Sequence, residues 1–123
     1  MKIIDFKKLI NSFKFAFKGL KLAFLEQTFR IFCFSAILVI ILMVILGLSS
    51  QEKITLTLVI ILVLFSELIN SQIEKILDIL QPNHDQKIKI IKDMSATAVV
   101  LICMGALIIG ILIFLPHILK ILC

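Results

Sequence analysis

Hydrophobic and polar residues alternate with a helical period over the first thirty positions. One stripe is apolar and recurs every three or four residues: Phe6, Ile10, Phe13, Phe17, Leu20 and Phe24. A second stripe recurs in the same way and is polar and mostly basic: Lys7, Asn11, Lys14, Lys18 and Lys21. A basic face opposite an aromatic face is typical of a helix that lies in a membrane interface. The pattern therefore predicts an amphipathic surface helix over residues 1–29.

Three long apolar segments follow and predict spanning helices over residues 31–48, 54–80 and 94–115. The first has eighteen residues without a charge, which is close to the shortest length that crosses hydrocarbon. The second should end at Leu80 or Gln81, because Pro82 disfavours helical geometry in the residue before it.

The ends of these segments also carry signals. We expect Ser50 to cap the second spanning helix, with Lys53 and not an acid at the third position, so that no full capping box forms. Pro116 and His117 are expected to mark the end of the third.

Composition and charge agree with a membrane protein. The chain has 123 residues, of which 61% are hydrophobic, and a domain of this size cannot bury so much apolar surface in water. We therefore predict one all-α integral membrane domain, with an N-terminal amphipathic surface helix and three transmembrane helices.

The net charge of +5 indicates basic cytoplasmic flanks and not nucleic acid binding. Seven Lys and Arg residues lie within residues 1–30, and four more lie between the last turns of the second span and the start of the third, whereas the other side has few. The N-terminus and the second loop are therefore expected in the cytoplasm, in the cytoplasmic membrane of a bacterium.

A polar stripe interrupts the apolar pattern of the second spanning helix. Glu67, Asn70, Ser71, Glu74 and Asp78 are spaced so that they share one helical face. Carboxylates at membrane depth are costly, and they usually mark a functional site. The stripe lies at the cytoplasmic end, where ATP and Mg²⁺ are available.

The residue types of the stripe suit phosphoryl transfer. Mg²⁺ is usually held by one or two carboxylates together with substrate phosphates, and a further carboxylate can serve as a general base. Lys92 and Asp93 begin the next span, and a lysine there can neutralise phosphate charge. The chain has no GxxxxGK[ST] loop and no kinase-type glycine-rich loop. Two alternatives stay open: a non-catalytic helix-bundle subunit held together by polar contacts, and an ion- or proton-conducting oligomer.

Two segments resemble the prokaryotic diacylglycerol kinase family. One runs from Glu67 through Asn70, Ser71 and Glu74 to Asp78 and is followed by Lys92-Asp93. The other holds Phe15-Ala16-Phe17-Lys18-Gly19-Leu20 and Glu26-Gln27-Thr28-Phe29-Arg30-Ile31. The resemblance extends in order from about Lys8 to Leu115.

The resemblance implies a small lipid kinase that assembles as a homotrimer with active sites shared between subunits. It would transfer the γ-phosphoryl group of ATP to the hydroxyl of a membrane lipid, either diacylglycerol or undecaprenol. It implies that Glu67 is the general base, that Asn70 orients the reacting groups and that Lys92 neutralises the γ-phosphate. Glu26 and Glu74 would hold Mg²⁺ with the phosphates.

The remaining implied contacts are to the nucleotide, made by Lys8, Phe15, Asp78, Asn83, His84, Asp85, Lys92 and Asp93. The chain departs from the family pattern at several positions and keeps every catalytic carboxylate: the departures are Phe15, Thr28, Phe32, Gln72 and Thr97. The spacing from Gly19 to Glu26, and Pro82 after Asp78, look more like the undecaprenol branch of the family.

Overall fold

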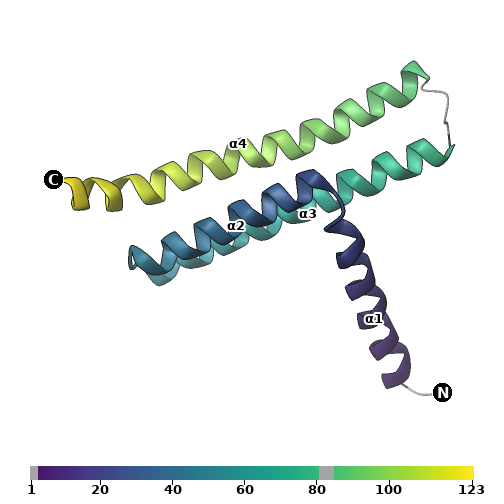
Figure 1. The fold of residues 1–123 in the computed structure, drawn as a ribbon, viewed down its shortest axis with the longest axis horizontal. Helices are drawn as coiled ribbons and strands as arrows, with labels where there is room; N and C mark the ends of the chain where they lie inside the picture. Colours follow the sequence, from purple (N-terminus) through teal and green to yellow (C-terminus); the bar gives the residue numbers. More distant parts are fainter. Residues whose placement is uncertain (1–2, 81–84) are drawn as a thin grey trace.

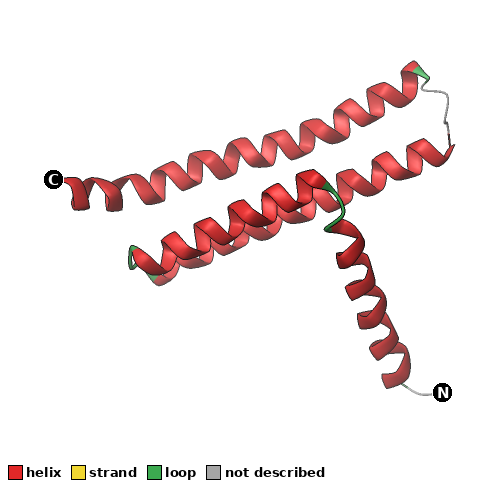
Figure 2. Ribbon diagram, viewed as in Figure 1, coloured by secondary structure: helices red, strands yellow, loops and turns green. Residues whose placement is uncertain are grey.

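The structure, a computed structural model, describes residues 3–80 and 85–123. Four helices follow one another there: α1 (Phe6–Ala23), α2 (Gln27–Ile45), α3 (Ser50–Leu80) and α4 (Gln86–Leu122). The described residues contain no strand (Figure 2). Helices α2, α3 and α4 are each long and apolar enough to cross a membrane. They run along one another, whereas α1 projects steeply away from them (Figure 1). The predicted all-helical fold with three helices able to span a membrane is confirmed, and α1 is a separate helix at its N-terminal end.

The distribution of polarity is the reverse of that in a water-soluble protein. Large apolar side chains cover the outside of the spanning helices, as at Phe34, Val44 and Leu112. The buried polar residues of the described chain all come from one stretch of α3, namely Ser66, Glu67, Asn70 and Ser71. An apolar exterior has no cost in lipid, so the helices need to cover only their polar side chains.

Helix α1 is separated from α2 by a short bend and not joined to it as one helix. Asp5 caps α1 by accepting a hydrogen bond from the backbone N–H of Lys8. The helix ends at Ala23, and Glu26 takes an extended conformation as the residue before α2. The prediction of one helix over residues 1–29 was therefore too long, because the apolar residues continue through the bend without a Pro or Gly to mark it. A straight helix would have separated Lys8 and Glu26 by about 27 Å along one axis.

A tight turn joins α2 to α3 and is specified by local sequence. Gly47 has a φ of 62°, a left-handed conformation that glycine adopts without strain. The backbone N–H of Leu48 reaches the carbonyl of Met43, and both side chains are buried in the same apolar cluster. This is the hydrogen bond and apolar contact of a Schellman C-cap.

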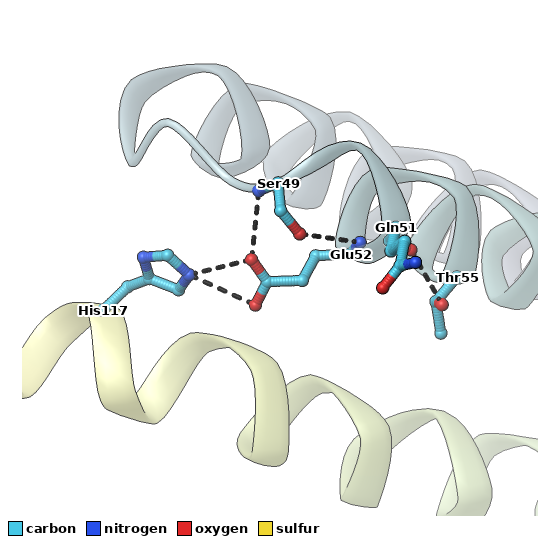
Figure 3. A network of polar contacts seen from close by, with 5 residues as sticks. All are labelled: Ser49, Gln51, Glu52, Thr55 and His117. Atoms are coloured by element: carbon cyan, nitrogen blue, oxygen red, sulfur yellow. Dashed lines mark hydrogen bonds and ion pairs between the residues drawn. The ribbon is translucent and has the colours of Figure 1, made fainter.

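The start of α3 corrects the predicted cap by one residue. Ser49, not Ser50, caps the helix, and Glu52 is three residues later (Figure 3). The Oγ of Ser49 accepts from the backbone N–H of Glu52 at 3.2 Å, and Oε1 of Glu52 accepts from the backbone N–H of Ser49 at 3.0 Å. These reciprocal bonds form a full capping box, which was not predicted because the cap was placed at Ser50.

Helix α4 extends beyond the predicted span at both ends. It begins at Gln86, eight residues before the expected start, and it continues through Pro116 to Leu122. Pro116 was expected to end the helix, but proline is tolerated inside membrane helices when neighbours supply compensating contacts. The turn after it is held to α3, because Nε2 of His117 lies 3.1 Å from Oε1 and 3.2 Å from Oε2 of Glu52 (Figure 3).

The described part of α3 extends to Leu80, and Gln81 and Pro82, where the sequence predicts the helix end, lie outside the described residues. Helix α3 has 31 residues and α4 has 37, which correspond to about 46 Å and about 55 Å at the standard rise. Both exceed a hydrocarbon core of about 30 Å, so each helix continues into an interfacial layer.

Replacement of the capping serine tests the corrected helix start. We expect Ser49→Ala to lower the free energy of unfolding by about 1 kcal/mol, because a backbone N–H of α3 loses its acceptor. Ser50→Ala, which changes the originally predicted cap, should leave stability nearly unchanged. Unfolding in micelles followed by circular dichroism measures both variants, and an equal loss in the two would contradict this assignment.

Candidate active site

A pocket of about 510 Å³ opens beside the bend between α1 and α2. Three carboxylates line it: Glu26 from the bend, and Glu67 and Glu74 from α3. The opposite wall comes from α4 and is mostly apolar, with Val99 and Cys103 among its residues. The pocket therefore combines an acidic side and a hydrocarbon-like side.

An apolar groove of about 620 Å³ continues from this pocket toward the other end of the bundle. The two share Phe32, Cys103 and Leu107, and the groove is lined by residues of α2, α3 and α4. A molecule with a polar head and a hydrocarbon tail could place its head in the acidic pocket and its tail in the apolar groove.

Glu67 and Asn70 are the most deeply placed polar residues of the pocket. Glu67 is 5% exposed and Asn70 is 8% exposed. Among the described residues, Oδ1 of Asn70 has no hydrogen-bond partner. A buried acceptor without a partner costs about 1–3 kcal/mol, and a ligand that donates a hydrogen bond would remove that cost. The two residues thus present an uncompensated acceptor and a carboxylate to the same pocket.

Glu26 is connected to α3 through two side chains. The Oγ of Ser71 lies 3.2 Å from Oε2 of Glu26 and 3.3 Å from Oε1 of Glu67. The Nζ of Lys75 lies 3.1 Å from Oε1 of Glu26 in a partly exposed ion pair. Glu26, which lies in the bend, therefore contacts the polar stripe of α3 through Ser71 and Lys75.

Lys92 and Asp78 form an ion pair between α4 and α3, with Nζ of Lys92 donating to Oδ1 of Asp78. Neither residue lines the pocket, and the pair lies farther along the two helices toward the α3–α4 connection. Asp93 is exposed, and its backbone carbonyl accepts from the hydroxyl of Thr97. Asp78 is thus the member of the acidic stripe that Lys92 contacts.

Other predicted nucleotide contacts are not brought to this pocket within one chain. Lys8 and Phe15 lie on α1, which is exposed along almost its whole length and projects away from the bundle (Figure 1). The Nζ of Lys18 lies over the ring of Phe15 at 5.7 Å, a cation–π contact. Asp85 caps α4 by accepting from the backbone N–H of Lys87. The predictions for Asn83 and His84 fall outside the described residues.

The carboxylates fit a hard cation only with further ligands. Across residues 3–80 and 85–123, no three His, Cys, Asp or Glu side chains are grouped closely enough to hold a metal ion. Glu26 and Glu74 nevertheless line one pocket, and Mg²⁺ usually takes one or two carboxylates and completes its shell with phosphates and water. The donor set therefore fits a cation that arrives with a phosphate-bearing substrate.

The ion pair of Lys75 with Glu26 was not predicted from the sequence. Lys75 belongs to no recognised motif, and its one distinguishing feature in the sequence is that it directly follows Glu74. Its partner Glu26 is 49 positions earlier in the chain, so no local spacing could have linked the two. The contact of Ser71 with Glu26 was missed for the same reason.

Comparisons with known proteins agree with this geometry. The family model for prokaryotic diacylglycerol kinase matches residues 14–114. A diacylglycerol kinase of Haemophilus influenzae is 34% identical over 108 residues, covering 86% of this chain and 92% of that protein. A diacylglycerol kinase of Synechocystis sp. is also 34% identical, over 114 residues. That alignment covers 91% of this chain, and the chain spans 65% of the length of the Synechocystis protein. The matched region includes the bend, the stripe of α3 and the start of α4, and the chain belongs to the prokaryotic diacylglycerol kinase family.

Proposed function

We propose that this protein is an ATP-dependent lipid kinase of the bacterial cytoplasmic membrane. It would transfer the γ-phosphoryl group of ATP to the hydroxyl of a membrane lipid, undecaprenol or diacylglycerol. The observation that carries the proposal is the buried carboxylate of Glu67 beside Asn70 in a pocket that continues into an apolar groove. Membership of a kinase family supports the reaction class.

The lipid hydroxyl is the group that suits the deepest part of the pocket. A hydroxyl can donate a hydrogen bond to a buried acceptor and can lose its proton to a neighbouring carboxylate. Glu67 would accept this proton, and Asn70 would orient the hydroxyl beside it. The apolar groove would hold the hydrocarbon chain, so that only the head group enters the acidic side.

The nucleotide would bind on the exposed side of the same pocket. Glu26 and Glu74 would hold Mg²⁺, which when bound would neutralise charge on the phosphates. Lys92 would turn from Asp78 toward the γ-phosphate, and Asp78, Asp85 and Asp93 lie on the same end of the bundle. Binding therefore requires the existing ion pairs of Lys92 and Lys75 to rearrange.

Lys8 and Phe15 would contact the nucleotide only when several copies of the chain assemble. Since α1 projects away from the pocket of its own chain, these residues are free to reach the nucleotide of a neighbouring copy (Figure 1). The projection of α1 supports active sites shared between subunits, and the number of subunits proposed, three, rests on the family resemblance alone. The basic face of α1 and the lysines at the start of α4 support a cytoplasmic N-terminus.

Transfer of labelled phosphate tests the reaction and the acceptor together. The purified protein in micelles, given Mg²⁺ and γ-labelled ATP, should label either undecaprenol or diacylglycerol, and the preferred lipid assigns the substrate. Absence of transfer to both lipids would contradict the proposal and favour a non-catalytic membrane subunit.

Replacement of Glu67 tests its role as a general base. Glu67→Gln should lower kcat by about 10²-fold or more, because an amide cannot accept the proton of the lipid hydroxyl. Glu52→Gln is a matched control on the same helix, since glutamine can also serve in a capping box. A Glu67→Gln protein that loses its fold or oligomer, yet keeps full activity per folded molecule, would identify Glu67 as a structural contact.

Replacement of Glu74 tests the cation site. Glu74→Gln should raise the Mg²⁺ concentration for half-maximal activity by about tenfold or more, because one carboxylate ligand is lost. Titration with Mg²⁺ at fixed ATP measures this shift, and removal of the metal by a chelator should abolish transfer. An unchanged requirement for Mg²⁺ in the variant would contradict the assignment of Glu74.

A further inference from the structure

The hydroxyl of Ser71 is shared by two carboxylates from different parts of the chain. Ser71 is 6% exposed, and its Oγ is within 3.3 Å of both Glu67 and Glu26. A serine hydroxyl has one O–H and can donate it to only one acceptor at a time. The hydroxyl therefore stands between the buried carboxylate of α3 and the carboxylate of the bend.

Other hydroxyl groups on these helices are used differently. Those of Ser12, Ser35, Thr55, Thr57 and Thr97 each donate to the backbone carbonyl four residues earlier. The hydroxyl of Ser66, which is also buried and precedes Ser71 by five residues, donates to the carbonyl of Val63 at 2.8 Å. Such bonds satisfy the hydroxyl within its own helix. Ser71 instead contacts carboxylates, and one of them lies 45 positions away.

Glu67 has no other recorded side-chain hydrogen bond among the described residues. Its side chain has three rotatable bonds, and a buried carboxylate without a donor is costly. The Ser71 hydroxyl thus supplies the contact that fixes where the carboxylate of Glu67 lies in the pocket. When a ligand draws the carboxylate of Glu26 away, the hydroxyl is left to Glu67 alone.

We propose that Ser71 is a positioning residue for the transfer reaction, and that its hydroxyl orients the carboxylate of Glu67 toward the lipid hydroxyl. This inference rests on the proposed function, in which Glu67 is the general base. Ser71 acts through Glu67 and does not itself touch the substrate. A misplacement of about 1 Å at a reacting group can cost about 10²-fold in rate, so a single hydroxyl is enough to control turnover.

Three variants separate positioning from packing. Ser71→Ala removes the hydroxyl, Ser71→Thr keeps it, and Ser66→Ala removes a hydroxyl of similar burial that contacts only its own helix. We expect Ser71→Ala to lower kcat by about 10- to 100-fold with little change in KM for the lipid. Ser71→Thr should recover most of the lost kcat, and Ser66→Ala should remain close to the unmodified protein.

Two further measurements distinguish a positioning role of Ser71 from a role in substrate binding or in stability. Binding of Mg²⁺ and ATP, measured by calorimetry without lipid, should be nearly the same in Ser71→Ala and the unmodified protein. The thermal unfolding midpoint of Ser71→Ala should fall no more than that of Ser66→Ala.

Several outcomes would overturn the inference. It fails if Ser71→Ala keeps full kcat, if Ser71→Thr does not recover activity, or if the loss of activity follows the loss of stability. In each of these cases the unmodified protein still phosphorylates lipid, and the proposed function stands. If the unmodified protein transfers no phosphate to either lipid, the proposed function fails and the role of Ser71 fails with it.

Discussion

The cost of placing carboxylates inside an apolar bundle governs this structure. Water is absent from the hydrocarbon core, so a buried polar group must find its partners within the protein. The stretch of α3 from Ser66 to Ser71 is the buried polar part of the described chain. The bend brings Glu26 to it, α4 covers it, and Lys75 places a positive charge beside it. The bend, α4 and Lys75 thus all meet at this one polar stretch of α3.

The two ends of the bundle are held together by different kinds of contact. At one end, the capping box of Ser49 and Glu52, the C-cap at Gly47 and an apolar cluster around Leu56 hold α2, α3 and α4 together. His117 adds a contact between α4 and the same capping glutamate. At the other end, contacts are polar and partly exposed, and such ion pairs contribute little to stability. The contacts that contribute most to stability thus lie away from the pocket, and the proposed binding of nucleotide would require the ion pairs at the other end to exchange partners.

Periodicity in the sequence was sufficient to predict the helices and the shared face of Glu67, Asn70, Ser71 and Glu74, because side-chain direction in a helix depends only on spacing. Helix ends were harder. The cap at Ser49 was assigned one residue too late, and Pro116 did not end α4. The bend before Glu26 has neither Pro nor Gly to mark it in the sequence, and the structure shows Ala23 and Phe29 buried on either side of it. Contacts such as Lys75 with Glu26 join distant positions and have no local signal.

The short bend has a consequence for how the protein is seated in its membrane. Helix α1 has few contacts with the other helices, so in a membrane its tilt and depth would depend on the lipid layer around its aromatic and basic faces. Glu26 follows it by three residues and is at the same time tied to α3. If α1 lies in the headgroup layer as its pattern predicts, the height of that layer would be coupled to a carboxylate of the pocket. Bilayer thickness and surface charge would then influence how the carboxylates of the site are aligned.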